Sequence, residues 1–323
     1  MTEALVDTYL TADDAAEALR ADAELGLTST PKWLPPKWFY DARGSELFED
    51  ITRLPEYYPT RAEREILHAR ATEIAQRTGA HTLVELGSGS SEKTRLLLDA
   101  LRHHGSLHEF VPLDVSGSAL REAVDAITAD YPGLAIHGVV GDFTEHLHRV
   151  PGEAPRLVAF LGGTIGNLLP DERAAFLQSM RAVLDGGEWL LLGTDLVKDP
   201  GVLVAAYDDA AGVTAEFNRN VLRVLNRELG ADFDVEAFSH RAVWDADHEW
   251  VEMRLVATRE MHVVVPEIGV SVDFARGEEM RTEISAKFRR DGVEAELAAA
   301  GFHLDGWWTD PQGRFALSLA RAA

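Results

Sequence analysis

The chain has 323 residues, 46% of them hydrophobic, and 54 acidic against 31 basic residues give it a formal net charge of −23. The length predicts two domains, or one domain with a large insertion, and the apolar share is typical of a packed globular protein. The acidic balance argues against nucleic acid or an anionic membrane as a partner. The absence of cysteine excludes disulfides, thiolate catalysis and cysteine metal sites.

The first ten residues lack the basic region and apolar run of a secretion signal. The best apolar stretch, residues 157–169, is broken by glycines and by Thr164 and Asn167, so a membrane span is not expected. We therefore expect a cytoplasmic protein, and we take a monomer as the working expectation.

The middle of the chain alternates short apolar segments with helical patterns. Strands rich in Val and Leu are predicted at residues 82–86, 110–113, 135–140, 157–161 and 189–192. Helices are predicted between them at residues 94–102, 117–130 and 171–184. Strands that are apolar on both faces and alternate with helices indicate a doubly wound, mostly parallel α/β sheet.

After Asp195 the pattern changes. Residues 200–230 look helical, and residues 251–265 alternate as one or two longer strands. A helix at 287–300, ending at Gly301, precedes strands at 302–308 and 315–319. We predict a nucleotide-type core of residues 61–196 plus 287–323, and a second module of residues 1–60 plus 197–286.

A glycine turn follows the first strand of the predicted sheet, in the order Glu85, Gly87, Gly89. A dinucleotide-binding loop requires a third glycine at position 92, where this chain has Glu92, which would sit badly against a pyrophosphate. The E-x-G-x-G form, with Ser90 in the next place, suits S-adenosylmethionine, which has no phosphate. On the loop alone, a tight turn without a ligand is an equally good interpretation.

Carboxylates at the ends of the next two strands favour the cofactor. Asp114 could accept both ribose hydroxyls, and Asp142 could accept the adenine amino group under a covering Phe143. A turn or helix cap for Asp114 and plain core packing for Phe143 are the alternatives. Lys93 could meet the carboxylate of the cofactor, or could be a solvated lysine on a helix face.

The segments around these landmarks resemble the histidine-specific Nα-methyltransferases that form hercynine in ergothioneine biosynthesis. The most specific matches are residues 37–41 with 44–48, 54–61, 160–167 and 283–288. The resemblance implies a class I (Rossmann-like) methyltransferase core and a substrate-binding α+β domain. It also implies S-adenosyl-L-methionine as cofactor and L-histidine as substrate.

The resemblance further implies roles for individual residues. Gly87, Lys93, Asp114, Asp142 and Phe143 would hold the cofactor. The amino acid head of the substrate would meet Tyr57, Gly162, Asn167 and Tyr207, and its side chain would meet Tyr40, Met253, Glu283 and Ser285.

The residues by themselves are less decisive about the substrate pocket. Asn167 ends an apolar strand in this interpretation, where a buried amide needs partners, so a ligand role is favoured. The tyrosines and Met253 could be core, Glu283 an exposed acid, and Ser285 the N-cap of the following helix.

The expected reaction needs an amine with a free lone pair and no covalent nucleophile. Asn167 and Tyr57 are the predicted catalytic residues, because each can accept an N–H of the amine. No metal is expected, since the 12 histidines show no H-E-x-x-H spacing. The alternatives are methylation of another small amino acid or amine, an NAD-dependent oxidoreductase, and a non-catalytic sensor of S-adenosylmethionine.

Overall fold

The computed structural model describes residues 4–89 and 91–323, and its internal contacts divide the chain into two compact units. Unit 1 comprises residues 1–10, 59–197 and 288–323, and unit 2 comprises residues 11–58 and 198–287. The predicted division placed all of residues 1–60 in the second module, whereas residues 4–10 are grouped with unit 1, to whose sheet Leu5–Thr8 add a strand. Among the described residues, every helix is too short or too polar to cross a membrane.

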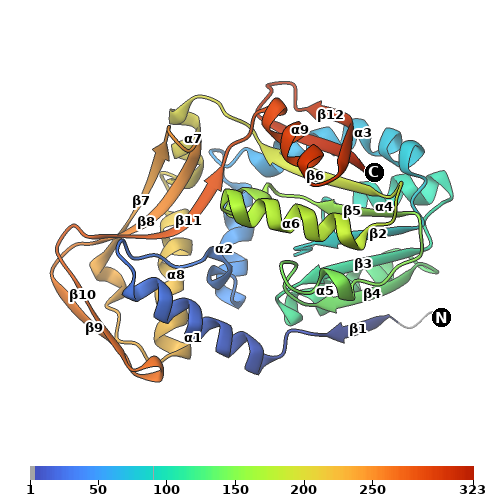
Figure 1. Ribbon diagram of the computed structural model, residues 1–323. Coiled ribbons are helices and arrows are strands. Elements are labelled where there is room, and N and C mark those ends of the chain that lie inside the picture. Colours follow the sequence, from blue (N-terminus) through green and yellow to red (C-terminus); the bar gives the residue numbers. More distant parts are fainter. Residues whose placement is uncertain (1–3, 90) are drawn as a thin grey trace. The chain divides into compact units, whose positions relative to one another are not determined.

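Unit 1 is built on an eight-stranded sheet with the order β1-β4-β3-β2-β5-β6-β13-β12 (Figure 1). The strands from β1 to β6 pair in parallel, and β13 and β12 continue the sheet antiparallel. Their bounds are β1 (Leu5–Thr8), β2 (Thr82–Leu86), β3 (Glu109–Asp114), β4 (Ala135–Val140), β5 (Arg156–Phe160), β6 (Trp189–Asp195), β12 (Phe302–Thr309) and β13 (Phe315–Ala322).

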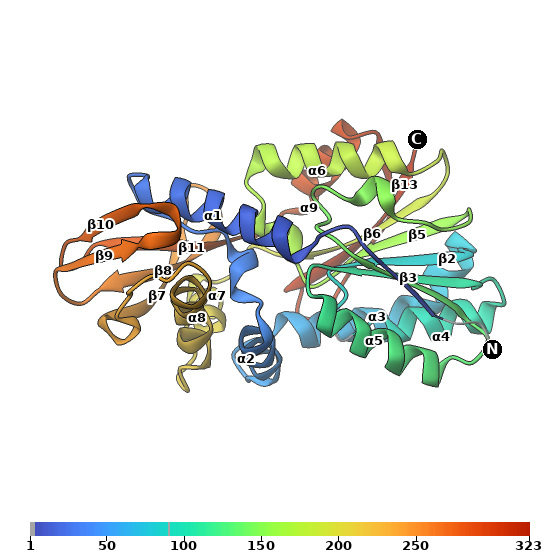
Figure 2. The ribbon, with the colours of Figure 1, turned by 90° about the horizontal axis from the view of Figure 1, so that it is seen from below.

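Helices cover both faces of this sheet. On one face lie α3 (Pro59–Thr78), α4 (Arg95–His104) and α5 (Gly117–Asp130), and on the other lie α6 (Pro170–Val183) and α9 (Arg290–Ala299) (Figure 2). Phe110, Leu157 and Leu191 are fully buried in the central strands, and each such side chain contributes about 1.5–3 kcal/mol. The predicted doubly wound α/β sheet is confirmed, because the chain winds outward from β2 in both directions.

Strand β1 accounts for the difference at the N-terminus. Leu5 to Thr8 pair in parallel with His137 to Val140 of β4, at the edge of the sheet. The strand has only four residues, and none of them is fully buried. A short edge strand without a buried face has no sequence pattern that would distinguish it.

Unit 2 contains a three-stranded antiparallel sheet, a separate hairpin and helices. The sheet has the order β11-β8-β7, and the hairpin pairs β9 with β10. The strands are β7 (Phe238–Asp245), β8 (Trp250–Ala257), β9 (Met261–Val265), β10 (Val270–Phe274) and β11 (Glu279–Ala286). The α-helices are α1 (Ala12–Thr28), α2 (Ala42–Arg53), α7 (Pro200–Tyr207) and α8 (Val213–Glu228), and short 3₁₀ turns are η1 (Pro36–Phe39), η4 (Val235–Ala237) and η5 (Pro266–Ile268).

The helical stretch predicted at 200–230 is two helices. Gly212 takes a left-handed φ of +77°, and the Asp209 carboxylate accepts the N–H groups of Val213 and Thr214 at 3.1 and 2.8 Å. The carboxylate therefore begins a new helix, α8, by capping its free N–H groups. Burial acts to raise the pKa of Asp209, but these hydrogen bonds outweigh it and the pKa is lowered.

The helix predicted to start at residue 287 starts at Arg290 instead. Lys287 precedes it in an extended segment, and its backbone N–H donates to the carbonyl of Glu249 at 2.8 Å. The prediction was wrong here, and Lys287 belongs to unit 2 rather than to the core.

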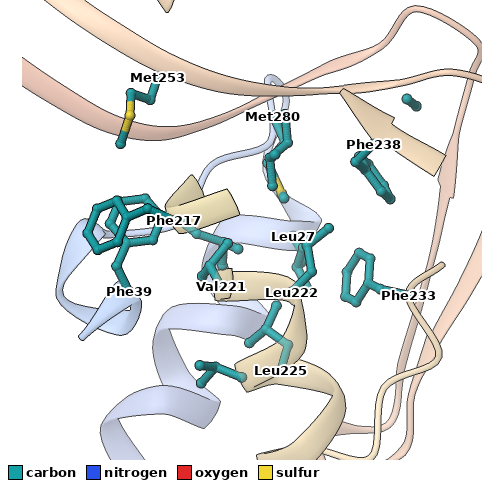
Figure 3. Packing of buried hydrophobic residues seen from close by; sticks show 14 of the residues in the cluster. Leu27, Phe39, Phe217, Val221, Leu222, Leu225, Phe233, Phe238, Met253 and Met280 are labelled. Carbon is teal, nitrogen blue, oxygen red and sulfur yellow. The ribbon is translucent and has the colours of Figure 1, made fainter. Parts of the chain in front are cut away.

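The core of unit 2 gathers side chains from its sheet and helices. Figure 3 shows Met253 of β8 pointing toward the rings of Phe39 and Phe217, with Val221 and Leu222 of α8 beside them. The rings of Phe39 and Phe217 have their centroids 4.7 Å apart. This packing fixes one face of the three-stranded sheet against α8.

Candidate active-site residues in the two units

The glycine loop of unit 1 leaves the end of β2 with left-handed backbone. Gly87 and Gly89 have φ of +66° and +48°, which an L-residue rarely adopts. The N–H groups of Gly87 and Ser88 donate to the carbonyl of Leu113 at 2.8 and 3.1 Å, which ties the loop to β3. Apart from each glycine's own chain neighbours, no described atom lies within 4 Å of the point where a Cβ of Gly87 or Gly89 would stand, so the loop has room for a ligand. Ser90, the next place of the motif, lies outside the described residues.

Asp114 ends β3 and holds the glycine loop. Its two carboxylate oxygens accept the backbone N–H groups of Gly89 and Ser116, each at 2.9 Å. Burial raises the pKa of Asp114, and these backbone hydrogen bonds oppose the rise. The N-cap of α5 is Ser116, so Asp114 is a turn residue rather than the helix cap considered from the sequence. Each oxygen still has a second lone pair with which to accept a hydroxyl.

Glu85 lies behind the loop and is almost fully buried. Its carboxylate accepts the hydroxyls of Ser91, at 2.8 Å, and of Thr94. Burial raises the pKa of Glu85 to about 7 despite these hydrogen bonds. The sequence interpretation used Glu85 only as part of the motif, but it anchors both ends of the turn that follows Gly89.

Asp142 and Phe143 follow β4. The Asp142 carboxylate accepts the backbone N–H and the hydroxyl of Thr144 at 2.8 and 2.6 Å through the same oxygen. The ring of Phe143 packs against those of Phe160 and Phe176, with centroids 5.0 and 5.7 Å apart. Phe143 is half-buried and contributes to core packing, while one oxygen of Asp142 is committed to the turn.

Lys93 is not a solvated lysine on a helix face, because it forms an ion pair with Glu63 of α3. The Glu63 side chain is fully buried and also accepts the backbone N–H of Gly162 at 2.8 Å. Space for this carboxylate exists only because residue 193 is a glycine, whose Cβ would stand 2.3 Å from it. Glu63 therefore brings Lys93 and Gly162 together, and no feature of the sequence identified it.

The prediction that Asn167 ends a strand was wrong. Asn167 is the last residue of the 3₁₀ turn η3 (Thr164–Asn167). Strand β5 stops at Phe160, and Gly162 and Gly163 both take left-handed φ, of +78° and +74°. Two successive left-handed residues turn the chain out of the sheet, so the apolar run of the sequence continues past the strand itself. Asn167 is half-buried in this turn.

In unit 2 a series of aromatic rings joins three of the predicted substrate residues. Tyr40 contacts Phe48 with ring centroids 5.6 Å apart, Phe48 contacts Tyr57 at 6.2 Å, and Tyr57 contacts Tyr207 at 6.4 Å. These rings come from the segment after η1, from α2, from the loop after α2 and from α7. Phe48 was part of a resembling segment but had been given no role.

A β-bulge places three further predicted substrate residues, Met253, Glu283 and Ser285, on the same face of the sheet. The pairing of β11 with β8 shifts between Arg281 and Glu283, after which Glu283 is opposite Met253 and Ser285 is opposite Val251. Residues directly opposite one another share a face. Ser285 is a buried strand residue, so its interpretation as a helix N-cap was wrong.

The two faces of this sheet differ in chemistry. The other face carries ion pairs of Arg254 with Glu252 and Glu279, and of Arg241 with Glu279. Without the bulge, Glu283 would follow the alternation of Glu279 and Arg281 onto this charged face. The bulge therefore brings Glu283 to the same face as Met253.

Three polar groups meet at the end of β11. The hydroxyls of Tyr207 and Ser285 are 2.7 Å apart, and the Lys287 ammonium donates to them at 2.9 and 2.7 Å. The side chains of all three residues are buried. We call Tyr207, Ser285 and Lys287 the hydroxyl cluster. The sequence assigns Lys287 no role, because the pattern there predicts the start of a helix.

His240 of β7 contacts the backbone of Tyr207, one member of the hydroxyl cluster. One ring nitrogen lies 2.7 Å from the Tyr207 carbonyl, and the other lies 2.8 Å from the amide nitrogen of Asn218. The amide nitrogen of Asn218 can only donate, so His240 Nδ1 accepts from it, and His240 Nε2 carries the proton that is donated to the Tyr207 carbonyl. Burial lowers the pKa of His240, which keeps this arrangement neutral.

The fold and these residues define the class of protein. A doubly wound sheet with a glycine loop after its first central strand, and an acid at the end of the next, is the arrangement of a class I S-adenosylmethionine-dependent methyltransferase. Residues 19–322 match the model of a family described as histidine-specific methyltransferase, SAM-dependent, and the chain belongs to that family. Among the described residues, no cluster of three or more His, Asp or Glu side chains could hold a metal ion.

Relatives match over nearly the whole chain. It is 61% identical over 312 residues to the histidine N-alpha-methyltransferase of Mycolicibacterium smegmatis, covering 97% of both chains. It is 59% identical over 315 residues to the protein of the same name from Mycobacterium tuberculosis, covering 98% of both. Ergothioneine biosynthesis protein 1 of Neurospora crassa is 31% identical over 290 residues, which are 86% of this chain and 32% of that protein.

Proposed function

We propose that this protein transfers methyl groups from S-adenosyl-L-methionine to the α-amino nitrogen of L-histidine, in the first step of ergothioneine biosynthesis. The product is hercynine, with three methyl groups on that nitrogen. The observation that carries the substrate is the near-complete match to two relatives named for this activity.

The cofactor is assigned to unit 1. The unfilled space beside Gly87 and Gly89 fits a ligand, and Asp114 carries lone pairs that fit the ribose hydroxyls. Asp142 would accept the adenine amino group at the end of the neighbouring strand, beside Phe143. Lys93 would meet the cofactor's carboxylate from its ion pair with Glu63, since its side chain remains 20% exposed.

The amino acid is assigned to residues of both units, each taken on its own evidence. Gly162, Asn167, Tyr57 and Tyr207 would address the amino acid head, and Tyr40, Met253, Glu283 and Ser285 the imidazole. The support in unit 2 is the aromatic series from Tyr40 to Tyr207 and the shared sheet face of Met253 and Glu283. The support for Asn167 is its place in the turn that Gly162 begins.

The chain's own residues must present a neutral amine. When bound, the cofactor supplies a methyl group on a sulfonium, which is transferred by in-line displacement. The Asn167 carbonyl oxygen would accept one N–H of the amine and the Tyr57 hydroxyl another, which leaves the lone pair directed at the methyl group. After each of the first two transfers the methylated amine would have to lose one proton to water to become neutral again, and the third transfer to the dimethylamine leaves a quaternary cation, which the aromatic faces of unit 2 would attract.

Two experiments test the proposal. Mass spectrometry of products after incubation with S-adenosylmethionine and all twenty amino acids should show a trimethylated histidine as the main product. Nuclear magnetic resonance of that product should place every methyl group on the α-nitrogen. Methylation of another amino acid would support the alternative substrate, and a methyl group on a ring nitrogen would overturn the assignment of the imidazole to recognition.

Other parts of the assignment stay predictions. We expect the protein to act as a monomer in the cytoplasm, on a small molecule, without nucleic acid or a membrane as partner. The net charge of −23 supports the exclusion of anionic polymers.

A further inference from the structure

Lys287 is a buried cation whose ammonium donates to two hydroxyls of the same unit. Only 4% of the residue is exposed, and its ammonium lies 2.7 Å from the Ser285 hydroxyl and 2.9 Å from that of Tyr207. The same ammonium lies 4.6 Å from the centroid of the Tyr207 ring. Burying an ammonium is costly unless it is well partnered, so this contact is a built feature of the fold.

The ammonium determines which way the two hydroxyls point. Lysine has three N–H donors and no acceptor, so both oxygens must accept from it. The hydroxyl protons of Ser285 and Tyr207 are therefore directed away from Lys287. One of the two protons lies in the 2.7 Å hydrogen bond between the hydroxyls, and the other is donated beyond that pair.

The carboxylate of Glu283 and the hydroxyl cluster lie along the same face of β11. Glu283 and Ser285 follow the bulge on one face, and Lys287 continues the same alternation just beyond the strand. A carboxylate accepts an N–H, and a hydroxyl held by an ammonium supplies an O–H. A neutral imidazole needs this combination, because one ring nitrogen donates and the other accepts.

We propose that Lys287 is a specificity-determining positioning residue, which holds the hydroxyl cluster as a hydrogen-bond donor for the unprotonated ring nitrogen of the substrate. The inference rests on the proposed function, because it takes the imidazole of histidine as the ring that is recognised. It adds that the pocket selects a ring with one acceptor nitrogen, and that this selection depends on a residue behind the hydroxyls.

The test compares substrates that differ only in the ring. Histidine has a donor and an acceptor, pyrrol-2-ylalanine and pyrrol-3-ylalanine each keep an N–H without an acceptor, and thienylalanine has neither. For each, kcat/KM is measured with the wild type, Lys287→Met, Lys287→Arg and the control Lys32→Met. Lys32 is a partly buried lysine of the same unit that pairs with Glu278.

Lys287→Met should lower the ratio of kcat/KM for histidine to that for the pyrrole analogues by about tenfold or more, because the hydroxyls become free to rotate. The ratio of kcat/KM for the pyrrole analogues to that for thienylalanine should not change, because it depends on the hydrogen bond that the ring N–H donates to Glu283. Lys287→Arg should recover part of the lost ratio, and Lys32→Met should keep the wild-type ratio. Calorimetry should show unchanged affinity for S-adenosylmethionine.

Equal losses for histidine and the pyrrole analogues would overturn the proposal, since they would place the accepting atom on the part of the substrate that all share. If Lys287→Met does not fold, Ser285→Ala removes a hydroxyl of the cluster with little change in volume and should reduce the same ratio. An unchanged ratio in folded Ser285→Ala would also overturn the proposal. Failure of the proposed function would give a different result, because the wild type would then methylate neither histidine nor any of the three analogues.

Discussion

The glycine loop of unit 1 and the hydroxyl cluster of unit 2 are built from different kinds of contact. Around the loop, carboxylates accept backbone N–H groups: those of Gly89 and Ser116 donate to Asp114, and that of Gly162 donates to Glu63. In the cluster, side chains of Tyr207, Ser285 and Lys287 contact one another directly. A loop formed by backbone depends on glycine and on strand ends, whereas the cluster depends on which side chains packing brings together.

The two units should therefore respond differently to substitution. Changes that displace backbone or buried charge in unit 1 should affect folding or cofactor binding, whereas changes in unit 2 should affect the choice of amino acid. Four substitutions test this comparison, from the largest expected effect to the smallest.

Gly193→Ala should have the largest effect. Its Cβ would stand 2.3 Å from the buried Glu63 carboxylate, which would have to leave Lys93 and the Gly162 N–H. Disrupting a buried ion pair costs about 3–5 kcal/mol, so the melting temperature should fall by many degrees. The control is Gly186→Ala, whose Cβ would have no described atom within 4 Å apart from its own chain neighbours. Equal melting temperatures for the two variants would contradict the packing described for Glu63.

Glu85 should make the stability of unit 1 depend on pH. Its pKa is raised from 4.5 to about 7, so between these values the folded chain holds a proton that the unfolded chain has lost. Stability therefore falls as the pH rises through this window, by at most about 1.4 kcal/mol per pH unit and on the order of 3 kcal/mol in total. Denaturant unfolding of Glu85→Gln from pH 5 to pH 8 should show a flatter profile than the wild type. Parallel profiles would mean that Glu85 does not carry this proton.

Asp114→Ala should weaken the binding of S-adenosylmethionine by about 1.5–3 kcal/mol, because a charged acceptor is lost and Gly89 is released. Asp114→Asn should fall between this variant and the wild type, since its amide oxygen can still accept. Calorimetry measures both, with Asp130→Ala as the control at an exposed acid of α5 that pairs with Arg95. An unchanged affinity in folded Asp114→Ala would reject the ribose assignment.

Glu283→Ala should change selectivity more than cofactor affinity. Removing the carboxylate removes the penalty for an apolar ring, so the preference for histidine over tryptophan in kcat/KM should fall by about tenfold. Adding Met253→Val, opposite it on β8, should make room for the larger ring. Glu279→Ala is a matched control on the same strand but the other face, where the carboxylate pairs with Arg241 and Arg254. A double variant that keeps the wild-type preference would remove Glu283 from the recognition site.

Unit 1 was largely predictable, because its information is local. The strand predicted at residues 82–86 is β2 as observed, Asp114 is the last residue of β3, and Gly87 and Asp142 follow the ends of β2 and β4 in a parallel sheet. Buried strands need apolar residues on both faces, and a backbone with positive φ favours glycine, so both features are visible without tertiary contacts. The exceptions are Glu63 and Asn167. The buried position of Glu63 depends on the space left by Gly193, far away in the sequence. Asn167 lies in a 3₁₀ turn that interrupts an apolar run.

The sequence by itself determined the doubly wound sheet, the glycine loop, the acids beside it and the family resemblance. Only the tertiary structure decided how the predicted substrate residues of unit 2 are arranged relative to one another. A bulge of one residue moves Glu283 and Ser285 to the other face of β11, and alternation alone cannot reveal such a shift. Lys287 sits beside arginines in the sequence, where a solvated helix start was the natural prediction. Its burial follows from the 2.9 Å contact with Tyr207, 80 residues away along the chain, which no local pattern encodes.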